Sequence, residues 1–263
     1  MRPERPTGLL GSPSPHAPRL YRMLLVGCRL VGVFLGLRLR LEGVEHLPRT
    51  PGGPAAGGWI AACFPHRTWI DPFVLAELLP VEPRLVFLGD GRAIFRSRLR
   101  RMVFGRIGGV VPIWPGGSRE AVEAHIAAAR SVIDAGAVFT LMPEVGPPVP
   151  VEQARPFGTG LGYFALRTGA PIVPLVLGGT HELYWGRQIV LRVSEPLTAR
   201  GLLGLEPNDP LPEPWTPEER AAAHRIVEEL HRRTADDVAA CHRLVEPTPG
   251  ARKPLCWLTN LFH

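Results

Sequence analysis

The sequence predicts an α/β fold with a mostly parallel central sheet flanked by helices. Short apolar segments that are typical of buried strands recur along the chain, and longer segments typical of helices separate them. Because parallel neighbours need a crossover connection, usually a helix, this alternation favours a largely parallel sheet. The 263 residues are enough for one domain with an appendage, and the 45% of hydrophobic residues exclude wholesale disorder.

The N-terminal region predicts a helix that lies in a membrane interface. Residues 1–19 are rich in proline, serine and arginine, which is typical of a flexible lead-in. Residues 20–37 are apolar but contain Arg22 and Arg29. An arginine inside a membrane-spanning helix is costly, so we expect a helix in the interface whose arginines reach lipid phosphates. A core helix is the main alternative. A secretory signal is disfavoured because Arg29 interrupts the apolar run and no cleavage site follows.

Residues 38–200 predict the α/β domain itself. Leucine and arginine alternate over residues 37–41, as in a half-buried strand, and prolines and glycines over 43–58 predict a loop. Apolar runs predict further strands at 59–64, 84–88, 109–113, 137–142, 171–177 and 188–193. Helices are expected at about 72–79, 93–106, 118–135 and 156–168.

Residues 201–263 predict a proline-rich linker, a C-terminal helix or helix pair, and a tail. The helix is expected over 217–244, with Thr216 as the N-cap and Pro217 at the first helical position. The tail at 252–262 is basic and then apolar, with one tryptophan. Such a tail either touches a membrane interface, where tryptophan is enriched, or packs on the domain as a strap.

The charge indicates an anionic partner. The formal net charge is +6, and all but one of the 30 basic residues are arginine. A compositional bias of the whole proteome would produce the same excess, but the functional interpretation is attraction to nucleic acid or to lipid head groups. Because no long basic run is interleaved with aromatic residues, we expect a membrane surface and no nucleic acid. The four cysteines show no CxxC spacing, which indicates reduced thiols without a zinc site or a disulfide framework.

His66 and Asp71 form the most informative pattern. Taken singly, Asp71 fits a helix cap and His66 a loop residue without a role. Together they lie in the turn between the strand at 59–64 and the helix at 72–79, where His66 can fold back toward the carboxylate. Asp71 would then fix the tautomer of the imidazole, whose other nitrogen could take a proton from a hydroxyl. No G-x-S-x-G serine accompanies the pair, which disfavours a serine esterase and suits direct attack by an acceptor hydroxyl.

The carboxyl ends of parallel strands meet at one rim of a sheet, and reactive groups lie on the loops beyond it. His66, Trp114 and Glu144 each follow an apolar run, so the sequence predicts all three on the same rim.

Several blocks in order resemble the glycerolipid acyltransferases of the 1-acylglycerol-3-phosphate O-acyltransferase type. The first block is Pro65-His66-Arg-Thr-Trp-Ile-Asp71, an H-x4-D pattern followed by Pro-Phe. Later blocks of the family are similar to Gly109-Val-Val-Pro-Ile113, Pro143-Glu144, Phe157-Gly-Thr-Gly160 and Ala170-Pro-Ile-Val-Pro174. One H-x4-D pattern arises easily by chance, whereas the ordered blocks cover residues 40–195.

The resemblance implies an enzyme and its chemistry. His66 would be the general base, oriented by Asp71, and the fatty acyl chain would pass from acyl-CoA or acyl-carrier protein to a hydroxyl of a lysophospholipid or other lipid-like acceptor. No covalent enzyme intermediate, metal or other cofactor would be needed. The protein would lie at the cytoplasmic face of the membrane as a peripheral or monotopic protein. The candidate substrate-binding residues are Arg67, Thr68, Trp114, Glu144, Gly146 and Arg155.

Two positions depart from the family pattern. The family's second block closes with an arginine where this chain has Trp114 or Pro115, and its third block has threonine and arginine where Glu144 is followed by Val-Gly146-Pro-Pro. In the family those arginines are thought to hold the acceptor's phosphate. Either another arginine substitutes, or the acceptor lacks a phosphate, or the chain is a non-catalytic lipid-binding protein derived from this fold. We expect a non-standard acceptor, and retention of the H-x4-D pair argues against loss of catalysis. The candidate substitutes are Arg67, Arg92, Arg96 and Arg155.

Gly158, Gly160 and Gly162 resemble a nucleotide-binding loop only loosely, and no strand directly precedes them. We therefore expect them to serve close packing at the start of a helix.

Overall fold

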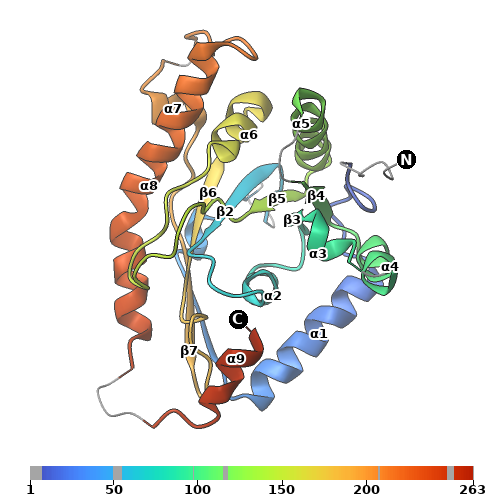
Figure 1. Cartoon of the computed structure of the whole chain (residues 1–263), viewed down its shortest axis with the longest axis vertical. Helices are drawn as coiled ribbons and strands as arrows, with labels where there is room; N and C mark the ends of the chain where they lie inside the picture. Colours follow the sequence, from blue (N-terminus) through green and yellow to red (C-terminus); the bar gives the residue numbers. More distant parts are fainter. Residues whose placement is uncertain are drawn as a thin grey trace.

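The computed structural model describes residues 8–49, 55–96, 98–114, 118–206, 208–247 and 252–262. A seven-stranded sheet lies at its centre, in the order β1-β7-β6-β2-β5-β3-β4 (Figure 1). Every neighbouring pair is parallel except β6 and β7, which are antiparallel. The predicted α/β class with a mostly parallel sheet is therefore confirmed. The strands are β1 (Arg38–Glu42), β2 (Trp59–Phe64), β3 (Leu85–Asp90), β4 (Val110–Ile113), β5 (Val138–Leu141), β6 (Ile172–Gly178) and β7 (Gln188–Val193).

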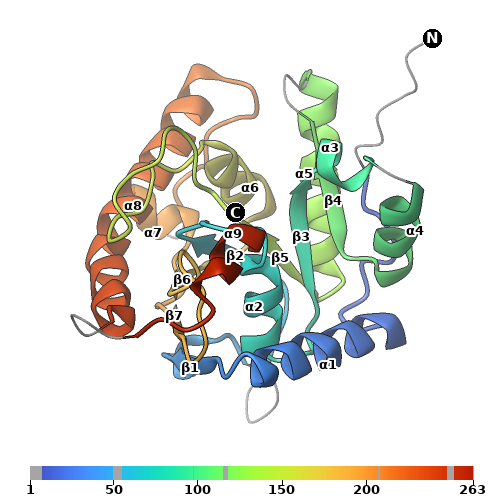
Figure 2. The same cartoon turned by 60° about the horizontal axis from the view of Figure 1, so that its bottom comes forward.

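Helices cover both faces of the sheet (Figures 1 and 2). They are α1 (Arg19–Phe34), α2 (Asp71–Leu78), α3 (Gly91–Ile94), α4 (Arg98–Ile107), α5 (Arg119–Asp134), α6 (Gly160–Thr168), α7 (Ala199–Leu203), α8 (Pro217–Val245) and α9 (Thr259–Phe262), with short 3-10 turns at Val44–His46 and Cys256–Leu258.

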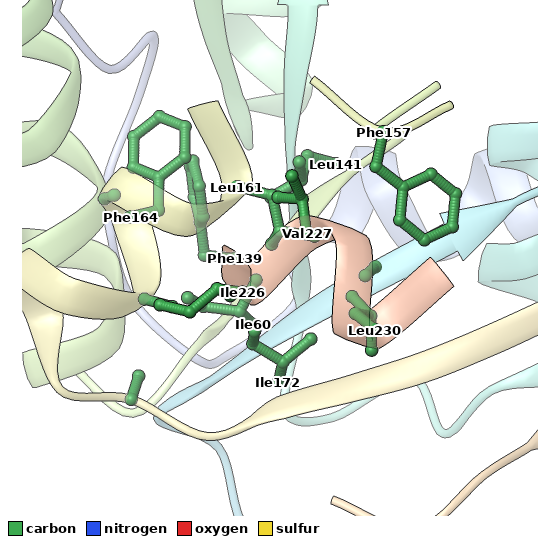
Figure 3. Close-up of a cluster of buried hydrophobic side chains, with 14 of the residues drawn as sticks. Ile60, Phe139, Leu141, Phe157, Leu161, Phe164, Ile172, Ile226, Val227 and Leu230 are labelled. Atoms are coloured by element: carbon green, nitrogen blue, oxygen red, sulfur yellow. The ribbon is translucent and has the colours of Figure 1, made fainter. Parts of the chain in front are cut away.

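Alternation along the strands divides the core into two clusters. Ile60, Ala62 and Phe64 of β2 point to the face covered by α5, α6, α7 and α8, where Figure 3 shows part of the packed cluster. The intervening residues of β2 point to the opposite face, which α1 and α2 cover. Successive side chains of a strand face opposite sides of the sheet, so a strand buried on both faces is apolar throughout. This is the physical reason that β2 could be predicted as one short apolar run.

Two predicted helices differ from the structure, and the predicted C-terminal helix agrees with it. The helix expected at 93–106 is two helices, since α3 ends at Ile94 and α4 begins at Arg98. Phe95, the residue after α3, packs its ring against Trp114. The helix expected at 156–168 begins only at Gly160. Phe157, which was expected within this helix, instead forms an isolated antiparallel bridge with Glu144. The C-terminal helix is a single helix, α8, and Thr216 caps it as predicted by accepting a hydrogen bond from the Glu219 N–H at 3.1 Å.

The lead-in predicted to be flexible packs on the domain over its described part, residues 8–18. Leu10 forms an antiparallel bridge with Val110. The buried guanidinium of Arg84 donates to the carbonyl oxygens of Ser12 and Ile107, and the Arg84 N–H donates to Pro15 at 2.8 Å. A buried charge has to be paired or hydrogen-bonded. Arg84 directly precedes β3, so its hydrogen bonds hold this segment at the N-terminal end of that strand.

Helix α1 lies against α2 and buries only Tyr21 and Leu25. Its arginines form ion pairs with the domain, Arg22 with Glu82 at 2.5 Å and Arg29 with Glu77 at 3.7 Å. Nearby carboxylates thus offer these two arginines partners within the protein, and their contact with lipid phosphates stays a prediction. Within the described residues, no helix has both the length and the apolar character needed to cross a membrane.

The expected close packing of the glycines is found at Gly162. A Cβ atom on Gly162 would lie 2.3 Å from the Ala223 carbonyl oxygen, so α6 and α8 touch backbone to backbone. A Cβ atom on Gly160 would meet no atom within 4 Å. Only the first of these two positions requires glycine for packing.

We predict that Gly162→Ala lowers the free energy of unfolding by about 2 kcal/mol, because the added methyl forces two helix backbones apart. Gly160→Ala is the matched control and should be neutral, or stabilising by up to about 1 kcal/mol, because it restricts the unfolded chain. Denaturant unfolding of both variants measures the difference. Equal effects of the two substitutions would contradict the proposed packing.

Candidate active site

The loop between β2 and α2 is built around the carboxylate of Asp71, which is 0% exposed. Its Oδ2 accepts hydrogen bonds from His66 Nδ1 at 2.7 Å and from the backbone N–H groups of Arg67 and Thr68 at 2.7 and 2.9 Å. Its Oδ1 accepts from the Thr68 hydroxyl at 3.0 Å. These four donors compensate the cost of burying a charge.

Asp71 does not cap α2, which corrects the simplest interpretation of Asp-Pro at a helix start. The Phe73 and Val74 N–H groups donate to the Ile70 carbonyl oxygen, and the Asp71 carboxylate turns back to the loop. Burial alone would raise the pKa of Asp71, but hydrogen bonds from His66 and from the Thr68 backbone outweigh it, and the pKa is lowered. The carboxyl is therefore ionised at neutral pH.

The ionised carboxylate determines the tautomer of His66. Because Asp71 can only accept, Nδ1 of His66 carries the proton and donates it, so the neutral ring has its lone pair on Nε2. The His66 side chain is 38% exposed, whereas Asp71 is fully enclosed. The imidazole of His66 is therefore partly open to solvent, while the carboxylate that holds its Nδ1 is buried.

Glu144 and Arg155 hold the backbone of His66 from the neighbouring strand. Glu144 follows β5, and its buried carboxylate accepts the His66 N–H and the Arg155 N–H, each at 2.6 Å. Arg155 Nη2 donates to the His66 carbonyl oxygen at 2.8 Å. Glu144 and Arg155 were both predicted to bind substrate. In the structure their polar groups form hydrogen bonds to the backbone of His66 and so position that residue.

Arg67 and Thr68 also belong to the loop. The Thr68 side chain is buried against Asp71, and Arg67 Nη2 donates to the carbonyl oxygens of Pro150 and Gln153 at 3.3 and 2.5 Å. Burial lowers the pKa of Arg67, and the Glu144 carboxylate partly offsets that effect. Among the described residues, Arg67 Nε has no hydrogen-bond partner although it is buried.

Trp114 and Gly146 lie outside this cluster. Trp114 follows β4, and the strand order places β5 and β3 between β4 and β2. The indole packs on Phe95, with 5.7 Å between ring centroids, and covers Gly91, where a Cβ atom would lie 2.6 Å from it. Gly146 lies in the exposed turn beyond Glu144 at a positive φ of 87°. The rim was predicted correctly, but Trp114 and His66 stand at separate points along it.

The four candidate arginines divide in the same way. Arg67 belongs to the loop of His66, and Arg155 donates a hydrogen bond to the His66 carbonyl oxygen. Arg92 is exposed and pairs with Asp90 at 3.1 Å, and Arg96 is exposed at the end of α3.

The comparisons with known proteins agree with this architecture. A family model described as Acyltransferase matches residues 38–178, which is more than half of the chain. The chain belongs to the acyltransferase family. This acyltransferase is also similar in structure to the 1-acyl-sn-glycerophosphate (LPA) acyltransferase PlsC from Thermotoga maritima, with a TM-score of 0.53. The match has 18% identity and covers 84% of this chain and 80% of that chain, which shows a shared fold. A search of curated proteins finds no match.

The segment after β6 contributes residues that the sequence did not point to. A pocket beside the loop of His66 is lined by Arg67, His181 and His242, among others. His181 is not among the site residues that the sequence analysis predicts. Its place just beyond the carboxyl end of β6 puts it on the same rim, so the rule that selected His66 could have found it. The remaining lining residues are Pro65, Val151, Leu177, Gly178, Gly179, Thr180, Val238 and Cys241.

Burial, followed by the charges of Arg187 and His242, lowers the pKa of His181 to about 4. Between pH 6.5 and about pH 4 the unfolded chain therefore binds a proton at this residue that the folded protein does not bind. Stability must fall as pH falls through this window.

We predict that His181→Gln loses less of its free energy of unfolding than wild type between pH 6.5 and pH 4. Denaturant unfolding at several pH values measures both slopes. The comparison at pH 8, where His181 is neutral in both states, gives the packing effect of the substitution by itself. Parallel curves for the two proteins below pH 6.5 would contradict the lowered pKa.

Proposed function

We propose that this acyltransferase moves a fatty acyl chain from acyl-CoA or acyl-carrier protein to a hydroxyl of a lysophospholipid or other lipid-like acceptor. His66 is the general base and Asp71 orients it. The observation that supports this assignment is the 2.7 Å hydrogen bond from His66 Nδ1 to a fully buried, ionised carboxylate. Such a bond directs the lone pair of Nε2 toward an incoming hydroxyl.

The reaction proceeds in two steps at the thioester carbon. Nε2 of His66 takes the proton from the acceptor hydroxyl as its oxygen attacks the carbonyl and forms a tetrahedral intermediate. The carbon–sulfur bond then breaks, the ester is released, and the thiolate takes the proton from the imidazolium. Asp71 stabilises the transient positive charge on the ring between the two steps.

Direct transfer to the acceptor is supported by the state of the nearby cysteine. Cys63 is buried in β2, and burial followed by the charges of Asp71 and Glu144 raises its pKa well above the ordinary value. A thiol in that state is a poor nucleophile. The alternative, a lipid-binding protein without turnover, would not require an imidazole held against a buried carboxylate.

The acceptor's head group is recognised on the side of Arg67 and Arg155, on this proposal. Trp114, which suggested an acceptor without a phosphate, is three strands away and packs on Phe95. Two of the four arginines considered as substitutes lie beside His66. We therefore favour a substituted phosphate contact over loss of the phosphate from the acceptor.

We further propose that α1 rests on the cytoplasmic face of a membrane as a peripheral or monotopic anchor. Met23, Val26, Leu30, Val33 and Phe34 recur at helical spacing and are exposed, Met23 to 69% and Phe34 to 72%. An exposed apolar stripe of this kind is typical of an interfacial helix. The C-terminal tail extends this surface, because Trp185 contacts both Phe34 and the carbonyl oxygen of Pro254.

We predict that His66→Ala lowers the rate of acyl transfer about 10²- to 10⁴-fold, because general base catalysis is lost. Transfer of labelled acyl chains from acyl-CoA to lysophospholipid measures the rate. Asp71→Asn should also slow transfer, since a neutral amide cannot stabilise the imidazolium.

His224→Ala is the matched control, because this histidine is exposed on α8 and pairs only with Glu228 among the described contacts. Its rate should equal that of wild type, and circular dichroism should show that all variants fold. A folded His66→Ala protein with full activity would refute the mechanism.

We predict that Val26→Glu/Leu30→Glu weakens binding to vesicles of anionic phospholipid by more than about tenfold, since two exposed apolar side chains that would enter the membrane are replaced by charges. Co-flotation measures the bound fraction. Val145→Glu/Val151→Glu carries the same charges in the exposed β5–α6 loop, which lies on the α8 side of the molecule (Figure 1). Equal binding of the two double variants would contradict an anchor at α1.

A further inference from the structure

The turn that follows β6, residues 179–181, lies beside the loop of His66. β6 and β2 pair in parallel, with Val176 opposite Phe64 at the end of β2. Because the two strands run in the same direction, the turn and the loop leave the sheet side by side at the same rim. Thr180 of the turn accordingly lines one pocket with residues of the loop. The turn is therefore placed to reach the side chains that the loop buries.

A glycine and a buried arginine fix the path of this turn. Gly179 has a positive φ of 100°, and a Cβ atom on it would lie 2.4 Å from the Gln188 carbonyl oxygen of β7. The guanidinium of Arg187 is fully buried and donates to the carbonyl oxygens of Gly179 at 3.0 Å and Val245 at 2.8 Å. The turn is thus held between β7 and the end of α8, which leaves little freedom to carry Thr180 away from the loop.

Thr180 brings a buried hydroxyl to Asp71. The residue is 1% exposed. Burial raises the pKa of Asp71, hydrogen bonds from His66 and the Thr68 backbone lower it more strongly, and the Thr180 hydroxyl adds to the lowering. Within the described part of the chain, however, this hydroxyl meets no acceptor with full hydrogen-bonding geometry. A buried hydroxyl without a partner is costly, so a small movement toward the carboxylate is favourable.

The carboxylate of Asp71 has room for another donor at one of its oxygens. Among the described hydrogen bonds, Oδ2 accepts from the His66 ring and from two backbone N–H groups, whereas Oδ1 accepts from the Thr68 hydroxyl. A carboxylate oxygen has two lone pairs, so Oδ1 can accept a second donor. Hydrogen bonds at catalytic sites are often long in the free enzyme and shorten when substrates bind.

We propose that Thr180 is a positioning residue, whose hydroxyl donates to Oδ1 of Asp71 in the working enzyme and keeps Oδ2 aligned on the ring of His66. The inference rests on the proposed function, since it concerns the same pair. With Thr68 donating from the loop and Thr180 from the turn, the carboxylate is held from two sides and cannot rotate away from the imidazole. Thr180 acts through Asp71 and touches no reacting atom. It lies beyond residue 178, where the segment that matches the family model ends.

The hydroxyl is tested with Thr180→Val, which keeps the shape of the side chain and removes the donor. For transfer from acyl-CoA to a lysophosphatidic acid, kcat should fall about tenfold while KM changes less than about twofold, the effect of losing a hydrogen bond to a charged group. Thr180→Ser restores the donor and should keep the kcat of wild type. The proposal is overturned if Thr180→Val has the wild-type kcat, or if Thr180→Ser is as slow as Thr180→Val.

NMR of the imidazole then shows whether Thr180 acts through Asp71. The carboxylate holds the Nδ1 proton of His66, so exchange of this proton with solvent reports how firmly the contact is kept. With lysophosphatidic acid bound and no acyl donor present, exchange should be about tenfold faster in Thr180→Val than in wild type. Thr180→Ser should exchange at the wild-type rate. A lower kcat without faster exchange would overturn the proposal, because Thr180 would then act on another group.

Thr140→Val is the matched control. Thr140 in β5 is 0% exposed, and its hydroxyl likewise meets no partner among the described residues. Because it lies outside the loop and the turn, kcat and the exchange rate should equal those of wild type. Thermal midpoints show which variants fold, and if Thr180→Val does not, Thr180→Ala against Thr180→Ser makes the same comparison. Equal losses in the Thr140 and Thr180 variants would overturn the proposal.

The two proposals fail in distinguishable ways. If wild type transfers no acyl chain to any acceptor, the proposed function fails, while the exchange of the Nδ1 proton still decides whether Thr180 holds Asp71. If transfer depends on His66 but Thr180→Val changes neither kcat nor exchange, the proposed function stands and the role of Thr180 does not.

Discussion

The buried carboxylate of Asp71 is the constraint on which the loop of His66 depends. It collects an imidazole, two backbone N–H groups and a hydroxyl within six consecutive residues. Leaving any of these donors unpaired inside the protein would be costly, so the loop has one compact arrangement. The same bonds lower the pKa of Asp71 against the effect of burial. Ionisation of this one group therefore fixes both the shape of the loop and the tautomer of His66.

A second carboxylate extends this constraint across the sheet. Glu144 comes from the end of β5, and β5 pairs directly with β2, so its side chain reaches the backbone of His66. Arg155 closes the arrangement by donating to the His66 carbonyl oxygen. The backbone of the histidine is thus held from the next strand while Asp71 holds its ring from its own loop. Pre-organisation of this kind reduces the cost of orienting a base for proton transfer.

The two faces of the sheet differ in the side chains that they expose. On the α1 and α2 face the described residues expose an apolar stripe, and Trp185 links it to the C-terminal segment. On the α8 face the loop adjoins a pocket lined by arginine and histidine. The proposed membrane anchor and the pocket beside the loop of His66 therefore lie on different faces of the sheet.

The sequence by itself determined the sheet, the order of strands and helices, and the pairing of His66 with Asp71, because these rest on local apolar periodicity and on spacing within one turn. It could not determine what surrounds His66. The contacts of His66 with Glu144 and Arg155 join residues far apart in the chain. The separation of Trp114 from His66 follows from the order of the strands within the sheet, which the periodicity along the chain does not encode. Only the tertiary structure could decide these contacts, since they depend on which strands become neighbours.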